Sequence, residues 1–69
     1  MDLKKIGELM KKRREFLKLR QEDLSELSKV TIKTIHLVEQ GNRNPSFETL
    51  KKLSEVLGLE LALKIKQVN

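Results

Sequence analysis

The sequence contains no cysteine, tryptophan or tyrosine, and it has only one proline and one histidine. Without cysteine the chain can form neither disulfides nor thiolate metal sites, and one histidine cannot build a zinc site alone. We therefore expect no metal and no cofactor. A domain of 69 residues buries only about 60% of its unfolded surface. Such small chains usually need further stabilisation by disulfides, a metal or an oligomeric partner. Oligomerisation is the support that remains.

Long apolar runs are also missing, since no stretch approaches the roughly 18 apolar residues of a membrane span. The N-terminus is charged at Asp2, Lys4 and Lys5 and lacks the apolar centre of a signal peptide. These features predict a cytoplasmic protein with no membrane partner. The sequence has no glycine-rich phosphate loop and no convincing carboxylate pair, which argues against an enzyme.

Charged residues are abundant, at 36% of the chain, and lysine and arginine outnumber acidic residues to give a formal net charge of +5. A small basic domain suits an anionic partner such as nucleic acid, a membrane surface or an acidic protein. A merely soluble, lysine-rich surface is the alternative explanation.

Apolar residues recur at helical spacing in four segments, which predict helices over residues 2–17, 21–28, 32–40 and 46–57. Asp2 and Thr31 are suitable N-caps, Ser46 suits a helix start, and Gly41 and Gly58 are suitable stops. Inward-facing residues around the second and third helices are predicted to be Leu24, Leu27, Val30, Ile35 and Val38.

The last segment changes period. Leu59, Leu61, Leu63 and Ile65 alternate with polar or small residues, which predicts a β-strand. A lone strand has no ladder partner, so we expect it to pair with the same strand of a second copy in an antiparallel sheet. A continued or frayed helix is the alternative. The expected division is therefore a DNA-binding domain over residues 1–58 and a dimerisation strand and tail over 59–69.

Two short helices joined by a tight turn, 21–28 and 32–40, match the helix-turn-helix unit. The second helix of such a pair fits the DNA major groove, where its outward side chains meet base edges. The runs Leu19-Arg20-Gln21-Glu22-Asp23-Leu24, Val30-Thr31, Thr34-Ile35 and Glu39-Gln40-Gly41-Asn42-Arg43-Asn44-Pro45-Ser46 resemble the phage-repressor-like (Cro/C1, or XRE) helix-turn-helix family. The closing Leu57-Gly58-Leu59-Glu60-Leu61 resembles the HipB-like antitoxin subgroup, whose members end in a dimerising strand.

This resemblance implies a mainly α, four-to-five-helix, lambda-repressor-like domain. It implies that Gln21 contacts a DNA phosphate and that Arg14 and Glu39 form an ion pair between the first and recognition helices. It also implies a groove-facing set, Thr31, Ile32, Lys33, Thr34, His36 and Leu37, followed by a backbone-approaching set, Asn42, Arg43 and Asn44.

Each of these residues has a structural alternative. Gln21 and Lys33 would then be ordinary solvated side chains, and Thr34 would bond only within its own helix. His36 would be a surface imidazole. Ile32 and Leu37 either extend the core or read thymine methyl groups.

The sequence departs from the family at two turns, where Lys18 and Lys29 replace the usual glycine. Either the lysines accept a left-handed conformation that costs about 1 kcal/mol or more, or the turns differ. Ser25 stands where alanine is common, and it is small enough for close helix packing.

The resemblance therefore implies a dimeric repressor of double-stranded DNA, acting at its own promoter. A palindromic operator would carry half-sites about one turn, roughly 34 Å, apart. The alternative is an antitoxin that binds a toxin protein and regulates its own operon.

Overall fold

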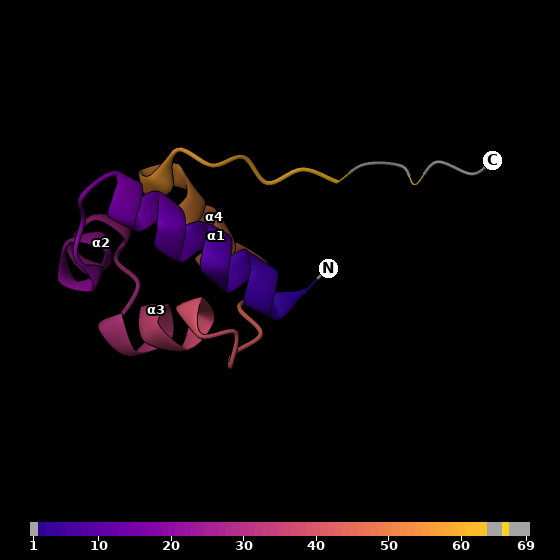
Figure 1. Ribbon diagram of the computed structural model, residues 1–69, viewed down its shortest axis with the longest axis horizontal. Coiled ribbons are helices and arrows are strands. Elements are labelled where there is room, and N and C mark those ends of the chain that lie inside the picture. The colour runs from indigo at the N-terminus through magenta and orange to yellow at the C-terminus, as the bar shows by residue number, and fades with distance from the viewer. Residues whose placement is uncertain (1, 64–65, 67–69) are drawn as a thin grey trace.

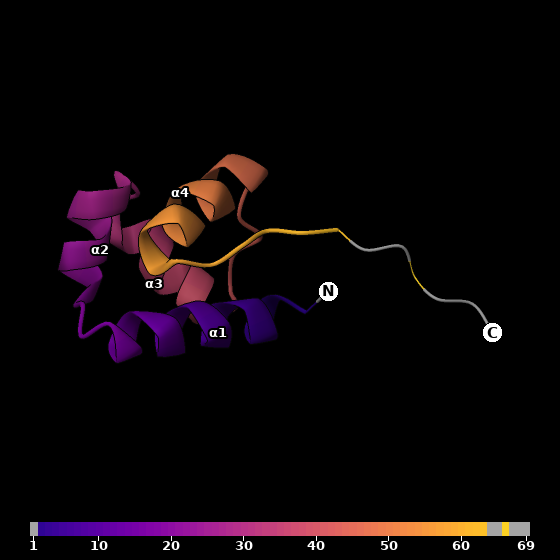
Figure 2. The same cartoon turned by 90° about the horizontal axis from the view of Figure 1, so that it is seen from above.

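The computed structural model describes residues 2–63 and residue 66. This part contains α1 (Leu3–Phe16), α2 (Gln21–Ser28), α3 (Ile32–Glu39) and α4 (Phe47–Leu57). All four predicted helices are confirmed, with each end within one residue of its predicted position. Helices α1 and α4 lie next to each other, α2 closes one end, and α3 lies along the opposite side of α1 from the segment that follows α4 (Figures 1 and 2).

Three of the helices begin with a side-chain cap. Asp2, Thr31 and Ser46 each accept a hydrogen bond from a backbone N–H in the first turn of the helix that follows. Helix α2 starts differently, because Asp23 Oδ2 accepts instead from the backbone N–H of Arg20 at 2.8 Å. Gly58 ends α4 in the left-handed conformation, at φ 70°.

The core is small and draws on all four helices. Its fully apolar centre consists of Met10, Leu24, Val30, Ile35, Val38, Leu53 and Leu57. Helix α3 packs on α1 and α2, and α2 also packs on α4. Four of the five inward residues predicted for the helix-turn-helix pair lie in this cluster.

The fifth prediction, Leu27, is wrong, because its side chain is 60% exposed. The buried face of α2 runs through Leu24 and Ser28 instead, and helical geometry places Leu27 off that stripe. Phe47 is 70% exposed. Phe16 is also exposed, and the guanidinium of Arg13 lies 5.1 Å from its ring centre.

Gly7 lets α1 approach α3 more closely than any side chain would allow. A Cβ at this position would lie 2.3 Å from the carbonyl oxygen of Val38 and 2.8 Å from that of Glu39. Real Cβ atoms do not come that close to backbone oxygen, so the two helices meet at this glycine. This contact sets how closely the C-terminal end of α3 packs on α1.

The two lysines at glycine positions both adopt the left-handed conformation. Lys18 has φ 59° and Lys29 has φ 65°. The sequence left open whether these turns are strained or differ from the family, and the structure shows the strained form. The cost is about 1–2 kcal/mol per residue.

The segment after α4 leaves the helical body along the side opposite α3 (Figure 1). Leu59 packs partly against the core and donates its backbone N–H to Ser54 O at 2.9 Å. Leu61 and Leu63 are 42% and 95% exposed. No strand is formed within residues 59–63 or at 66, and Ile65 lies outside the described residues. Strand pairing across a dimer therefore stays a prediction. No helix in the described ranges is long and apolar enough to cross a membrane.

Candidate nucleic-acid interface

The turn between α2 and α3 is held by hydrogen bonds from two serines. Ser25 Oγ donates to Val30 O at 2.6 Å, and Ser28 Oγ accepts from the backbone N–H of Val30 at 3.2 Å. The backbone N–H of Lys29 also reaches Ser25 O at 2.9 Å. With Val30 buried in the core, these bonds fix the angle between the two helices of the pair.

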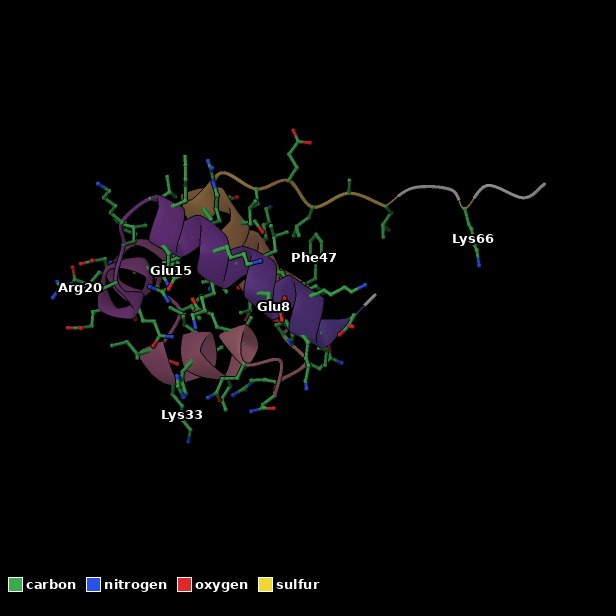
Figure 3. All side chains as sticks on the ribbon, in the orientation of Figure 1. Glu8, Glu15, Arg20, Lys33, Phe47 and Lys66 are labelled. Atoms are coloured by element: carbon green, nitrogen blue, oxygen red, sulfur yellow. The ribbon has the colours of Figure 1, made fainter. Side chains whose placement is uncertain are left out.

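The outer face of α3 is open to solvent. Lys33 and His36 are exposed, and Lys33 points directly away from the helical body (Figure 3). Ile32 is 43% exposed, so it does not belong to the core, whereas Leu37 is half-buried. One helix thus presents cationic, imidazole and aliphatic groups side by side, the mixture that reads phosphates, base edges and thymine methyls.

The two threonines at the start of α3 bond to each other. Thr31 Oγ1 accepts from the backbone N–H of Thr34 at 3.3 Å and lies 3.0 Å from Thr34 Oγ1, with its hydroxyl as donor. Thr34 therefore does bond within its own helix, as the structural alternative held. Both hydroxyls keep lone pairs, and the Thr34 O–H stays available to donate to a phosphate oxygen.

Arg14 and Glu39 form a buried, bidentate ion pair. Arg14 Nε lies 2.7 Å from Glu39 Oε2, and Arg14 Nη2 lies 2.9 Å from Oε1. Arg14 Nη1 also donates to Leu19 O at 2.8 Å. Bonding to Glu39 raises the pKa of Arg14 above its ordinary value, so the guanidinium stays charged. It ties α1 to the end of α3.

Gln21 has a structural partner that the sequence did not reveal. Its Nε2 donates to Glu39 Oε1 at 3.0 Å, so the first residue of α2 is tied to the last residue of α3. An amide nitrogen carries two N–H donors, and one of them remains for a DNA phosphate. The bond through Glu39 therefore holds the amide in place and leaves a donor free.

The loop after α3 presents three exposed polar residues, Asn42, Arg43 and Asn44. Gly41 turns the chain at φ 72°, and its N–H reaches Val38 O at 3.0 Å while the N–H of Asn42 reaches Leu37 O at 3.0 Å. These two bonds satisfy carbonyls at the end of the helix. The loop leaves α3 on a defined path next to its outer face.

A hollow of about 140 Å³ opens between α1, the start of α2 and the last turn of α3. Five side chains line it, all polar or charged: Lys11, Gln21, His36, Glu39 and Gln40. Lys11 and Gln40 were not among the sequence-predicted site residues. The only available signal was that Lys11 precedes Arg14 by three residues, a spacing that puts both on one helix face.

The structure thus brings Gln21, His36 and the Arg14–Glu39 pair to one end of α3, and it places Thr31, Ile32 and Lys33 at the other end of that helix. The predicted dimerisation residues Leu59, Leu61 and Leu63 lie on the far side of the body. Over residues 2–63 and 66, no three histidine or acidic side chains come together as metal ligands would.

Helices α2 and α3 are joined by a tight turn, and α3 combines an exposed outer face with buried polar bonds to its neighbours. This arrangement defines a helix-turn-helix domain. The helix-turn-helix family profile matches residues 10–64, and the chain belongs to this family, of the Cro/C1 type. The family is one of DNA-binding transcription regulators. The finer resemblance to HipB-like antitoxins stays a prediction.

The chain is similar to two named relatives and to one solved structure. Proteins of Methanococcus maripaludis and Methanococcus vannielii, each named as an HTH-type transcriptional regulatory protein, are 40% identical over 63 residues, or 91% of this chain. The chain spans only 18% of their length. The restriction-modification controller protein C.AhdI of Aeromonas hydrophila superposes with a TM-score of 0.80 at 34% identity, over 84% of this chain and 88% of that one.

Proposed function

We propose that this chain binds double-stranded DNA sequence-specifically, with α3 in the major groove, and acts as a dimeric transcriptional repressor. The observation that carries the proposal is the exposed outer face of α3, held at both ends by buried polar contacts. A groove of about 12 Å width admits one helix. The outer side of α3, which would enter the groove, is exposed, and the inner side packs on α1 and α2.

The residues divide by what they would contact. Lys33, Ile32 and His36 on the outer face of α3 would meet base edges, with Ile32 against thymine methyl groups. A larger group would fix register on the phosphates, and it comprises Gln21, Thr31, Thr34, Asn42, Arg43 and Asn44. Leu37, half-buried, would touch the groove only at its rim.

The regulatory part of the proposal is supported by the named relatives. The methanococcal proteins are named as transcriptional regulatory proteins, and C.AhdI is named as a controller protein. The first DNA to test is the sequence upstream of this chain's gene.

Dimerisation is proposed through Leu59, Leu61, Leu63 and Ile65. Phe47, Leu61 and Leu63 are exposed and, with Leu50 and Ala62, line an open apolar groove of about 370 Å³. A second copy seated on this groove would cover the leucines. The segment after α4, which lines this groove, runs on the side of the body away from α3 (Figure 1), so a partner would leave the DNA-facing helix free.

An antitoxin function is the second candidate, and the same groove favours it. A toxin protein would cover Leu61 and Leu63 in place of, or in addition to, a second copy. Co-purification of this chain with the product of the adjacent gene, lost in Leu63→Asp, would support it.

The test is a fluorescence-anisotropy titration of upstream DNA against a scrambled duplex, at physiological salt. We expect the upstream duplex to bind at least a hundredfold more tightly. Lys33→Ala should reduce this preference, whereas Lys52→Ala, which removes a lysine of α4 paired with Glu48, should leave it unchanged. Equal affinity for both duplexes would leave only charge-driven binding and contradict the proposal.

A further inference from the structure

Lys11 is not among the DNA-contacting residues predicted from the sequence, yet it lines the hollow beside α3. We infer that Lys11 is a DNA-phosphate ligand, and that the hollow formed by Lys11, Gln21, His36, Glu39 and Gln40 receives one phosphate of the DNA backbone. This rests on the proposed function. It adds a DNA contact from α1, a helix that otherwise packs on α3 and α4.

The hollow has the right position and lining for one phosphate. It is made by three different helices and opens beside the outer face of α3, where the DNA backbone would pass. Its volume of about 140 Å³ accommodates a single tetrahedral anion together with water. Every lining residue is polar or charged.

The carboxylate in the wall does not oppose an anion. Glu39 Oε1 accepts from both Arg14 Nη2 and Gln21 Nε2, and Oε2 accepts from Arg14 Nε. The charges of Glu39 and Arg14 cancel within this pair. The formal charge that remains in the lining is the ammonium of Lys11.

The neighbouring amides add donors rather than charge. Gln21 uses one of its two N–H groups on Glu39, and the other remains for a phosphate oxygen. Gln40 accepts from Asn42 Nδ2 through its own oxygen at 3.3 Å, so its amide nitrogen keeps both N–H groups. A cation flanked by amide donors suits an anionic oxygen, such as that of a DNA phosphate.

An ordinary surface ion pair is the competing explanation for Lys11, because Glu8 and Glu15 lie three and four residues away on the same helix. The described residues contain ion pairs at Arg14–Glu39, Arg20–Asp23 and Lys52–Glu48, and none that includes Lys11. In Figure 3, Glu8 and Glu15 project from α1, and Lys11 lines the hollow.

Lys12 provides a matched control. It is an exposed lysine on the same helix, one residue further on, and it does not line the hollow. Lys11→Ala and Lys12→Ala change the net charge equally and have the same helix propensity change. Long-range electrostatics therefore affects both variants alike, and only a direct phosphate contact separates them.

The experiment titrates each full-length variant into the upstream duplex in phosphate-free buffer, from about 50 to 200 mM salt. We expect Lys11→Ala to weaken binding about tenfold and to reduce the slope of log K against log salt by about 0.9, the value of one lost phosphate contact. Lys12→Ala should change affinity less than twofold. The loss at Lys11 should be uniform across operator and scrambled DNA.

The outcomes distinguish a failure of the Lys11 assignment from a failure of the proposed function. Equal, small effects of Lys11→Ala and Lys12→Ala on a wild-type protein that binds DNA would overturn the Lys11 assignment alone. A wild-type protein that binds no duplex would overturn the proposed function and the assignment with it. Lys11→Arg, which keeps the charge, should retain the wild-type salt slope, and circular dichroism should show unchanged helix content in all three variants.

Discussion

The side-chain amide of Gln21 donates to the carboxylate of Glu39 at 3.0 Å, joining the first residue of α2 to the last residue of α3. Arg14 holds the same carboxylate from α1. The residue proposed to contact a phosphate and the helix proposed to enter the major groove are therefore positioned by one buried group. Any change at Glu39 should act on stability and on DNA binding together.

Glu39→Ala is predicted to destabilise the fold by about 3 kcal/mol or more, because it leaves the buried guanidinium of Arg14 without its partner. Urea denaturation followed by circular dichroism measures the loss. The control is Glu48→Ala, which breaks the exposed pair with Lys52 and should cost less than about 1 kcal/mol. Similar losses for both variants would show that the buried pair has no special role.

Gly7→Ala is predicted to destabilise by roughly 2 kcal/mol or more. Helix propensity alone would make alanine more favourable than glycine by about 1 kcal/mol, so the sign of the change tests the contact. The Cβ would lie 2.3 Å from Val38 O, which forces α1 and α3 apart. Glu8→Ala, at the next and exposed position, serves as control and should be nearly neutral. A stabilised Gly7→Ala variant would contradict the close approach.

Lys18→Gly and Lys29→Gly are each predicted to stabilise the fold by about 1 kcal/mol, because glycine relieves the left-handed strain at φ 59° and 65°. Thermal unfolding should show a higher Tm for each. Lys12→Gly, placed in the helical part of α1, should instead destabilise by a similar amount. If all three glycine variants lower Tm, the strain at these turns is not what limits stability.

Asp23 should contribute to stability only above acidic pH. Its hydrogen bonds to the side chain and backbone of Arg20 hold the pKa of Asp23 below its ordinary value of 3.8. A group with a lowered folded pKa stabilises above the unfolded pKa, and this contribution is lost as pH falls through the folded pKa. Asp23→Asn should therefore lower stability at pH 7 and show less change than wild type between pH 5 and pH 2. Parallel pH curves for the two proteins would rule out this role.

Leu63→Asp is predicted to shift the protein from dimer to monomer without unfolding it. The side chain is 95% exposed in the single chain, so its replacement costs the monomer almost nothing. Analytical ultracentrifugation measures the assembly, and Lys66→Asp in the same segment is the control. Deleting residues 59–69 should have the same effect as Leu63→Asp. A truncated protein that stays dimeric would place the interface elsewhere.

Periodicity and capping residues were enough to predict the four helices, because Asp2, Thr31 and Gly58 act through local hydrogen bonds and φ preferences. The same local information failed at Leu27. Its apolar character fits an inward position, but the close packing of α2 uses Leu24 and Ser28, and only the assembled core decides which neighbour faces inward. Residues 59–63 show the same limit, since a strand depends on a ladder partner that a single chain does not supply.

The recognition helix and its outward residues follow from the sequence by itself, because they depend on spacing within eight residues and on the helix-turn-helix resemblance. The tertiary structure decided what lies beside that helix. Gly7 meets Val38, 31 positions away, and Gln21 bonds to Glu39, 18 positions away. Lys11 lines a hollow together with residues of other helices. Such pairs leave no periodic trace, because their distance is set by how the helices pack and not by any local rule.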